Sequence, residues 1–442
     1  MHRRDFIQKS TAAALSSTAI PLFNTLSSYQ QERLRIGVIG CNGMGWSNMR
    51  SLLQMEDIDC VAICDVDQGV AGKRMGNYSK MRDNKVVLSS DYRELLADKN
   101  VDAVVIGTPD HWHCKIFCDA LEAGKHVYVE KPLANSIEEA YIMRRAAAQH
   151  PGLMVQVGQW QRSGPHYAEA IDIVRSGDLG NIRLVKTWAY QGWMKPMEQK
   201  PDGAVPAGVD YKMWLGPAPE RPFNPNRFHF NFRWFWDYAG GLMTDWGVHE
   251  IDIALFAMNA DAPKSVMASG GKLAYPNDPA ETPDTLQTVF EYNDFNMLWE
   301  HATGIDGGPY GRTEGIAFIG NNGTLVVNRQ GYDVIEEVKS GRGEDRKPLM
   351  RLIEPVKRPE GVNYLNLHTQ NFINAIKQGD ASILKTPIVS GSVAAINAHM
   401  GNVAYKTGEK VYWDATKSGF TSKKANKLVV PDYHNGWKMP PY

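Results

Sequence analysis

The sequence predicts an α/β domain with a doubly wound parallel sheet, followed by an α+β domain. Short apolar strands alternate with helical segments over the first third of the chain, and a glycine-rich turn follows the first strand. From about Val155 the alternation ends, and strands follow one another with turns between them. The 442 residues are too many for one compact core. We therefore expect residues 1–32 outside the fold, a first domain over residues 33–155 and a second over residues 156–442.

The composition excludes several classes of protein. Charged residues make up 22% of the chain and the formal net charge is −1, so no basic field is available to bind nucleic acid. No uninterrupted apolar run reaches ~18 residues, the length that a membrane-spanning helix needs. With 43% hydrophobic residues, the composition is typical of a soluble globular protein.

The N-terminal segment resembles a twin-arginine export signal. Arg3 and Arg4 are followed by Phe6 and Ile7, and a mildly apolar stretch then covers residues 10–26. A disordered basic tail is the alternative interpretation, and no clean Ala-x-Ala cleavage site is present. We expect export of the folded protein to the periplasm.

Cysteine usage does not indicate a disulfide framework. The chain has five cysteines, an odd number, and all lie in the first third of the sequence after the signal. We interpret them as small buried hydrophobic residues. A Cys₂His₂ metal site that uses His111 and His113 is the less favoured alternative. Export in the folded state is consistent with a secreted protein that lacks disulfides.

The glycine-rich turn predicts a dinucleotide site. Leu34–Ile39 is typical of a buried parallel strand, residues 40–45 form the turn, and a helical pattern begins at Trp46. Strand, turn and helix N-terminus together present backbone N–H groups and the helix dipole to a pyrophosphate. Asn42 stands at the second glycine position of the usual motif. The predicted cofactor contacts of this turn are Gly40, Asn42, Gly43, Met44 and Gly45.

Asp65 indicates which of the two nicotinamide dinucleotides, NAD or NADP, the predicted site binds. It ends the second apolar strand, residues 59–65, and stands 20 positions after Gly45. A carboxylate at this place accepts hydrogen bonds from the ribose hydroxyls and repels a 2′-phosphate. We therefore expect NAD rather than NADP. A helix cap is the alternative role of Asp65.

The alternation continues to about residue 150. In order, the sequence predicts a capped helix start at Asp91 and Glu94, a strand over residues 101–107, a helix over residues 115–123 that stops at Gly124, the strand His126–Val129, and a helix with a Ser136–Glu139 capping box that runs to about His150. Repeated strand–helix units of this kind specify a parallel sheet.

Two motifs follow strands of this predicted sheet, and the carboxyl ends of such strands are where open α/β sheets bind ligands. One motif spans residues 108–113 and the other is Glu130-Lys131-Pro132. A lysine beside a nicotinamide can hold a substrate hydroxyl and stabilise oxyanion character as hydride leaves carbon. A surface lysine paired with Glu130 is the alternative. The candidates for cofactor contact are Thr108, Pro109, His111, His113, Glu130 and Lys131.

Asp245 and His249 are candidate acid–base residues. They are four positions apart, so on a helix they share one face, and residues 248–258 support such a helix. A histidine is the usual base for a hydroxyl at neutral pH, and a carboxylate can orient it. Asp252 is either a second partner or a surface acid. A metal site is the weak alternative because no further ligand is evident, so we expect no metal.

The second domain is predicted to be rich in strands. The expected strands cover residues 182–190, 264–272, 286–292, 297–303, 315–320 and 324–328, and an amphipathic helix is expected over residues 365–376. Between the first two strands lies a loop over residues 193–246, rich in prolines and aromatic residues, which we call the aromatic loop.

The aromatic loop is a candidate for sugar binding. Aromatic faces pack against the C–H face of a pyranose, and sites are commonly built on loops. Most of these rings are expected only to form a small core within the loop. Beyond Lys131, Asp245 and His249, the candidate substrate contacts are Trp236, Arg162 and Tyr190, with Gln159 and His166 as weaker ones.

Four motifs give the chain a resemblance to the Gfo/Idh/MocA oxidoreductases, which include glucose–fructose oxidoreductase and inositol dehydrogenase. The motifs cover residues 37–45, 108–113, 130–132 and 240–252, and the similarity extends roughly over residues 34–413. The resemblance implies a Rossmann domain followed by a domain with an open, mainly antiparallel sheet, whose far face forms oligomer contacts. It also implies that Lys131 contacts the reacting hydroxyl, through a cis bond to Pro132, and that His249, aided by Asp245, carries the proton.

These observations predict an NAD-dependent oxidoreductase that acts on a secondary alcohol of a sugar, glycoside or polyol. Export requires a tightly bound cofactor, because no pool of soluble dinucleotide exists outside the cytoplasm. The alternative is glycoside cleavage through a transient keto-sugar, in which the bound NAD is oxidant and then reductant. A cofactor-bound sensor without turnover is a third interpretation, which the co-occurrence of lysine, aspartate and histidine argues against.

Overall fold

A parallel sheet forms the first half of the fold, in the computed structural model, which describes residues 33–339 and 347–442. Its six strands are in the order β3-β2-β1-β4-β5-β6, and every pair is parallel. The elements are β1 (Leu34–Ile39), α1 (Gly43–Leu52), β2 (Ile58–Cys64), α2 (Gln68–Tyr78), β3 (Val87–Ser89), α3 (Tyr92–Ala97), β4 (Ala103–Ile106), η1 (Asp110–Trp112), α4 (His113–Glu122), β5 (His126–Val129), α5 (Ile137–Gln149) and β6 (Val155–Val157). The predicted doubly wound sheet is confirmed.

Local side-chain chemistry sets the helix starts in this half. The Asp67 carboxylate caps α2 and the Asp91 carboxylate caps α3. At α5 the Ser136 hydroxyl accepts from the Glu139 N–H at 3.1 Å, while the Glu139 carboxylate accepts from the Asn135 N–H at 3.1 Å. This arrangement matches the predicted capping box.

The parallel sheet ends near the predicted boundary between the two halves. Its last strand, β6, pairs in parallel with β5 through Val157. The first 32 residues, which carry the predicted export signal, lie outside the described residues.

The second half is built on a ten-stranded sheet in the order β14-β13-β12-β11-β7-β10-β9-β8-β15-β16. Its strands are β7 (Leu184–Gln191), β8 (Ser265–Gly271), β9 (Thr285–Glu291), β10 (Asn296–Thr303), β11 (Glu314–Ile319), β12 (Gly323–Asn328), β13 (Gly331–Glu336), β14 (Val356–Lys357), β15 (Val411–Asp414) and β16 (Gly419–Phe420). All neighbours are antiparallel except β7 and β10. The mainly antiparallel sheet is confirmed.

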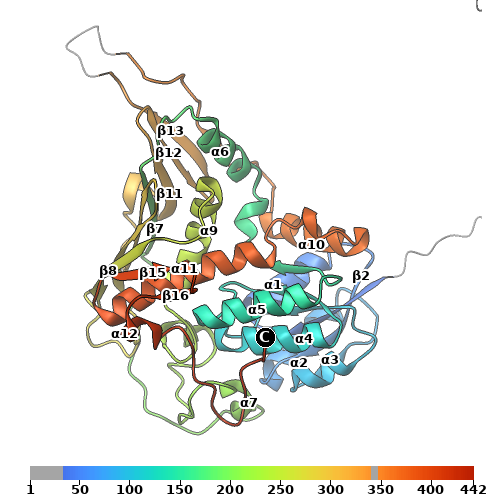
Figure 1. The fold of residues 1–442 in the computed structure, drawn as a ribbon. Helices are drawn as coiled ribbons and strands as arrows, with labels where there is room; N and C mark the ends of the chain where they lie inside the picture. Colours follow the sequence, from blue (N-terminus) through green and yellow to red (C-terminus); the bar gives the residue numbers. More distant parts are fainter. Residues whose placement is uncertain (1–32, 340–346) are drawn as a thin grey trace, which may run out of the picture. The chain divides into compact units, whose positions relative to one another are not determined.

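Helices cover one face of this sheet (Figure 1). The helices that follow β6 in the described residues are η2 (Trp160–Ser163), α6 (Pro165–Ser176), α7 (Tyr211–Leu215), η3 (His229–Trp234), α8 (Leu242–Asp245), α9 (Gly247–Met258), η4 (Pro309–Gly311), α10 (Tyr364–Gln378), η6 (Ala381–Ile383), α11 (Ile388–Thr407) and α12 (Lys423–Asn426). α6 packs on β12 and β13, and α9 packs on β7 and β11. α11 contacts both β8 and α5, so it joins the two sheets.

The longest helix, α11, has no counterpart in the sequence prediction. It is buried over most of its length, on several sides. A helix that is buried all round lacks the alternation of apolar and polar residues on which a sequence-based assignment depends. The predicted helix over residues 365–376 is found as α10, which has an exposed polar face.

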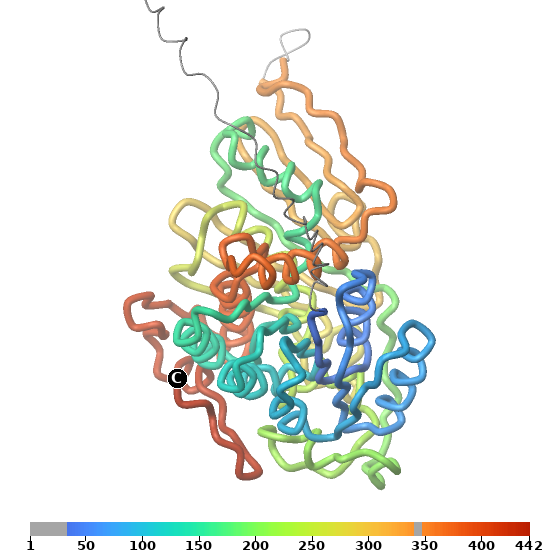
Figure 2. The backbone as a smooth tube through the Cα atoms, turned by 90° about the vertical axis from the view of Figure 1, so that its right-hand side faces the viewer, coloured from blue at the N-terminus to red at the C-terminus, as the bar shows by residue number. Residues whose placement is uncertain are grey.

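The aromatic loop and the C-terminal tail (residues 427–442) lie side by side (Figure 2). The His434 N–H donates to the Pro217 carbonyl at 3.0 Å, and Asn435 Nδ2 donates to the Gly216 carbonyl at 2.8 Å. Trp437 packs edge-on against Trp112, with the ring centroids 4.9 Å apart. The tail therefore fastens the aromatic loop to the first half of the fold.

The five cysteines are buried and unpaired, as the sequence analysis expects. Within residues 33–339 and 347–442 no group of three or more His, Cys, Asp or Glu side chains has the arrangement of a metal site. In the same residues no helix is long and apolar enough to cross a membrane.

Candidate active site

A cavity of about 570 Å³ lies at the carboxyl ends of β1, β2, β4 and β5. Its volume is within the range of natural ligand sites. One wall is the Rossmann sheet edge and the other is the aromatic loop. The sheet-side lining is Ile39, Gly40, Asn42, Gly43, Met44, Ser47, Cys64, Asp65, Val66, Ser90, Tyr92, Gly107, Thr108, Pro109, Asp110, Trp112, Ile116, Glu130 and Lys131, and the loop-side lining is Met213, Trp214, Phe228, His229, Phe230, Phe232 and Arg233.

The glycine turn has the shape that a pyrophosphate requires. Gly40 has φ +76°, and a Cβ there would stand 2.6 Å from the Thr108 amide nitrogen. Gly43 has φ +45° and open space where a side chain would stand. The Asn42 side chain makes no cap bond at the N-terminus of α1. The first N–H groups of α1 are therefore free of a side-chain cap and border the cavity, where an anion can bind them.

Gly45 lets α1 approach the sheet and does not line the cavity. A Cβ on Gly45 would stand 1.9 Å from the Gly40 carbonyl oxygen. Gly45 therefore has a packing role behind the turn, and its contact with the cofactor stays a prediction.

We expect Gly45→Ala to destabilise the protein by about 1–3 kcal/mol, because the turn and helix must move apart, and to lower the bound cofactor. Thermal unfolding and cofactor content of the purified protein measure both effects. Gly72→Ala is the matched control: Gly72 lies in α2 with open space around it, so this variant should gain ~0.5–1 kcal/mol. Equal effects of the two substitutions would contradict the packing role.

Lys131 lies on the cavity wall and is bonded to Asp245. Its ammonium donates to Asp245 Oδ1 and to the Asp245 carbonyl, both at 2.8 Å, and its peptide bond to Pro132 is cis. Arg233 Nε donates to the same Oδ1 at 3.2 Å. Glu130, the alternative partner of Lys131, instead accepts from Asn48 Nδ2 at 2.6 Å. Two segments far apart in sequence thus meet at one carboxylate.

The charges at this meeting point have shifted pKa values. Burial alone would raise the pKa of Asp245, but the Lys131 and Arg233 cations lower it to about 2. Asp110, which lines the same cavity, has its pKa raised to about 8 by burial. Asp245 is therefore ionised at neutral pH, whereas Asp110 is predominantly protonated. Neither Asp110 nor Arg233 was singled out in the sequence, although Asp110 lies inside the motif of residues 108–113.

His249 lies in the first turn of α9 and is buried. Its Nδ1 atom has no hydrogen-bond partner in the described part of the chain. Burial, together with the Lys131 and Arg329 cations, lowers the pKa of His249 well below its usual range. The imidazole is therefore neutral at pH 7 and has a free nitrogen that can take a proton.

Asp245 and His249 lie on successive helices. Asp245 ends α8, α9 begins at Gly247, and Trp246 between them keeps a right-handed helical conformation, with φ −92° and ψ −39°. No hydrogen bond between them occurs in the described residues. The Asp245 carboxylate binds Lys131 and Arg233 instead, because two cations compete for it more strongly than a neutral imidazole.

Trp160, Trp246 and Arg329 surround His249. The centroid of the imidazole lies 5.8 Å from that of Trp160 and 6.3 Å from that of Trp246. The Arg329 guanidinium carbon stands 4.5 Å from the Trp160 ring centroid and 4.3 Å from the Trp246 ring centroid. These residues come from η2, the α8–α9 junction and the β12–β13 turn, so no sequence spacing could have brought them together.

Both halves of the chain match models of one family. Residues 34–159 match the model described as the oxidoreductase family with an NAD-binding Rossmann fold, and residues 181–272 match the C-terminal alpha/beta domain of the same family. Over these two segments the chain matches the Gfo/Idh/MocA oxidoreductase family. Its first domain is thus an NAD-binding Rossmann domain, which agrees with the open glycine turn.

The names of similar proteins describe different activities. The chain is 26% identical to a scyllo-inositol 2-dehydrogenase (NAD(+)) of Bacillus subtilis, over 75% of this chain and 83% of that one. It is 32% identical to an alpha-N-acetylgalactosaminidase of Shewanella oneidensis, but over only 32% of this chain and 36% of the relative. The fold is similar to a levoglucosan dehydrogenase solved with NADH and levoglucosan, with TM-score 0.63, 20% identity, and coverage of 86% and 99%.

Asp65 lines the cavity after β2, within the segment that matches the NAD-binding Rossmann model. Its two carboxylate oxygens accept from the Cys41 N–H and the Asp67 N–H, both at 3.0 Å. Oδ2 also accepts from the Cys41 thiol at 3.4 Å, whereas Oδ1 retains a lone pair for a further donor, such as a ribose hydroxyl. Arg74, which the sequence analysis did not consider, donates to the Cys41 carbonyl and to Asn42 Oδ1 at the rim of the turn.

We expect Asp65→Ala to weaken NAD binding by about 10–100-fold and to reduce the discrimination against NADP, since a hydrogen bond to a charged group contributes ~1.5–3 kcal/mol. Titration of cofactor-depleted protein with NAD and with NADP measures both effects. Asp57→Ala, which removes an ion pair with Lys377 far from the cavity, should leave both affinities unchanged. An unaltered preference in Asp65→Ala would exclude a ribose contact for this carboxylate.

Three predicted substrate residues do not line the cavity. Arg162 forms a two-pronged ion pair with the buried Asp252, at 2.8 Å for each bond, which also shows that Asp252 is neither a surface acid nor a partner of His249. The Tyr190 hydroxyl donates to Glu300 Oε1 at 3.3 Å. Trp236 donates through Nε1 to the Glu281 carbonyl and stacks on Tyr405. All three side chains are held by internal structural contacts.

His111 and His113 also have structural roles and do not line the cavity. His111 Nε2 donates to the Trp214 carbonyl at 3.1 Å, and the two ring nitrogens of His113 lie 2.8 and 3.0 Å from the Pro132 and Thr108 carbonyl oxygens, to one of which the neutral ring donates. Burial lowers the pKa of each histidine to about 4. His113 thereby fixes the two strand ends that carry Thr108 and Lys131.

The weaker candidates differ from one another. His166 bonds to the Asn328 carbonyl and to the Tyr364 hydroxyl, away from the cavity lining. Gln159 is buried, and neither of its side-chain polar atoms has a partner in the described residues. In the aromatic loop most rings form an internal core, as expected; its members include Trp214, Phe223, Phe228, Phe232, Trp234, Phe235 and Tyr238.

Proposed function

We propose that this protein is an NAD-dependent oxidoreductase that transfers hydride to or from a secondary alcohol of a sugar, a glycoside or a polyol. The observation that carries the proposal is Lys131, which lines the cavity and forms an ion pair with Asp245, together with the buried, neutral His249 four residues further along the chain. The inositol dehydrogenase relative and the levoglucosan dehydrogenase fold neighbour support a substrate of this class.

Each polar residue has a distinct task in the proposed reaction. Bound NAD supplies the hydride acceptor. Lys131 donates a hydrogen bond to the substrate oxygen and stabilises the negative charge that develops there. Asp245, kept ionised by Lys131 and Arg233, holds the ammonium in position. His249 accepts the hydroxyl proton. In the reverse direction the protonated imidazole returns it.

We further propose that NAD stays bound between turnovers and that the protein is exported to the periplasm. The aromatic loop supports retention because it is attached to the first half beside the cavity. The Gln68 N–H donates to the Gly208 carbonyl at 3.0 Å, and His229 Nε2 stands 3.0 Å from Asp67 Oδ2. Export is supported by Arg3-Arg4 and the apolar stretch that follows. Cell fractionation and cofactor analysis of the purified periplasmic protein test both.

Cleavage of glycosides is the second candidate function. In that reaction the oxidised sugar carbon acidifies the neighbouring C–H, the aglycone leaves by elimination, and the same hydride returns to the ketone. The similarity to the alpha-N-acetylgalactosaminidase favours it, although that match covers about a third of each chain.

Product analysis separates the two functions. The purified full-length protein is incubated with sugars, polyols and aryl glycosides, and the cofactor and products are identified by mass spectrometry. A stoichiometric keto product together with NADH supports net oxidation. Free aglycone without a net redox change supports cleavage instead. Bound NAD that no compound reduces, with no release of aglycone, would exclude both and leave the sensor interpretation.

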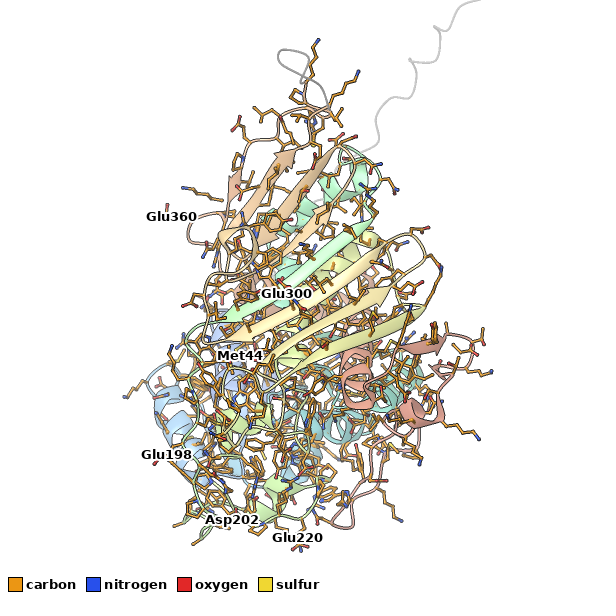
Figure 3. The ribbon with its side chains drawn as sticks, turned by 90° about the vertical axis from the view of Figure 1, so that its left-hand side faces the viewer. Met44, Glu198, Asp202, Glu220, Glu300 and Glu360 are labelled. Carbon is orange, nitrogen blue, oxygen red and sulfur yellow. The ribbon has the colours of Figure 1, made fainter. Side chains whose placement is uncertain are left out.

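We also propose that the chain forms a homo-oligomer through the ten-stranded sheet. The face opposite to α6, α9 and α11 carries Glu300 and is turned to the viewer in Figure 3. Leu184, Met267 and Ile335 on this face are 44%, 46% and 50% exposed, and an apolar sheet face of this kind favours association. Light scattering of the purified protein tests the oligomeric state.

A further inference from the structure

Arg329 is held between two tryptophan rings beside the proposed base. Its guanidinium carbon stands within 4.5 Å of the centroids of both Trp160 and Trp246, and both rings are neighbours of the His249 imidazole. Stacking on two faces fixes the plane of the guanidinium and reduces the entropy that it loses when it binds a ligand.

Most donors of this guanidinium are unused. Nη2 donates to Gln161 Oε1 at 3.2 Å, whereas the buried Nε has no hydrogen-bond partner in the described residues. The described residues contain no ion pair of Arg329 with a carboxylate, in contrast to Arg162 and Arg233, which each bind an aspartate. A guanidinium has five N–H donors in a planar fork, so several remain available.

The two neighbouring acids, Glu250 and Glu314, form no ion pair with the Arg329 guanidinium in the described residues. Glu250, next to His249 on α9, is fully buried, and burial raises its pKa to about 8, so it is predominantly protonated at neutral pH. Glu314 accepts from the Thr313 hydroxyl and from the Arg329 backbone N–H. Arg329 is therefore a half-buried cation without an ion-pair partner, and such a charge is costly unless an anion compensates it.

We propose that Arg329 binds a carboxylate of the substrate, so that the compound oxidised is a sugar acid or a glycoside of one, and not a neutral sugar or polyol. This inference rests on the proposed function, because it assumes that substrate reaches His249. A planar carboxylate matches the two-pronged donor geometry of the guanidinium. Its negative charge would also offset one of the two cations that weaken His249 as a base.

Binding to the full-length, NAD-loaded protein tests the proposal without requiring turnover. Isothermal titration compares glucuronate with glucose, galacturonate with galactose, and methyl glucuronide with its methyl ester. We expect at least one carboxylate to bind about 10–100-fold more tightly than its neutral counterpart, the usual effect of a charged hydrogen bond. If no carboxylate binds better than its neutral counterpart, the proposal is overturned.

Variants at two arginines show whether the preference comes from this residue. Arg329→Gln should abolish the preference, and Arg329→Lys should restore only part of it because the fork is lost. Arg175→Gln is the matched control: Arg175 stacks on Phe256 with 4.6 Å to the ring centroid and donates to the Ala257 carbonyl, so it should keep the preference. A carboxylate preference that survives in Arg329→Gln would overturn the assignment.

The absorbance of bound NADH distinguishes failure of this proposal from failure of the proposed function. If carboxylates bind through Arg329 but never reduce the cofactor, the proposed anion site is supported and the proposed dehydrogenase function is excluded. If neutral sugars reduce the cofactor while carboxylates neither bind nor react, the dehydrogenase function is supported and the anion site at Arg329 is excluded.

Discussion

Replacing Lys131 by alanine should lower kcat by about 10²–10³-fold, the usual effect of removing one donor that stabilises developing negative charge. Bound NAD should remain, because the pyrophosphate site consists of the glycine turn and the N-terminus of α1, to which Lys131 does not contribute. The rate of reduction of the bound cofactor and the NAD content of the same sample measure the two quantities.

The fold should survive this change. Asp245 keeps Arg233 as a partner at 3.2 Å after the ammonium is lost, so no buried carboxylate is left uncompensated. Lys115→Ala is the control, since Lys115 forms a comparable pair with Asp119 at 2.6 Å on α4 and does not line the cavity. Turnover of Lys131→Ala at the wild-type rate would remove the mechanism proposed above, provided that both variants retain NAD and unfold at similar temperatures.

The sequence predicts best those parts of the site that short local motifs specify. The glycine turn, Asp65 and the Glu-Lys-Pro motif each follow a recognisable strand, and the parallel sheet necessarily brings its strand ends to one edge. The residues that were missed or misplaced depend on contacts over long sequence separations. Arg233 reaches Asp245 from within the folded aromatic loop, and Arg329 reaches the tryptophans beside His249 from the β12–β13 turn.

The partners of Asp245 could not be predicted from its spacing to His249. The Asp245 carboxylate binds two cations, which come from residues 131 and 233, and no local pattern could reveal them. Likewise, His111 and His113 lie at the expected strand end, but each side chain hydrogen-bonds to a backbone carbonyl and neither lines the cavity.

His249→Gln should lower kcat by ~10²–10⁴-fold, the range for loss of a positioned proton acceptor, with little change in KM. Glutamine keeps a polar side chain of similar size but cannot take up a proton at neutral pH. His399→Gln is the control: His399 is also buried, with its pKa lowered to about 4, but it bonds to the Ala134 carbonyl away from the cavity. That variant should lose stability and retain kcat per folded molecule.

The pH dependence of the reaction tests the same residue independently. Because the folded-state pKa of His249 is lowered, its imidazole remains unprotonated as the pH falls through 6.5, and wild-type oxidation should show no loss attributable to it near that pH. Lys131 is one cause of the lowering. In Lys131→Ala the pKa of His249 should therefore rise toward its ordinary value, and the residual activity should decline at a higher pH than in the wild type. If activity falls at the same acidic pH in Lys131→Ala as in the wild type, His249 does not titrate beside Lys131 and cannot be the proton acceptor.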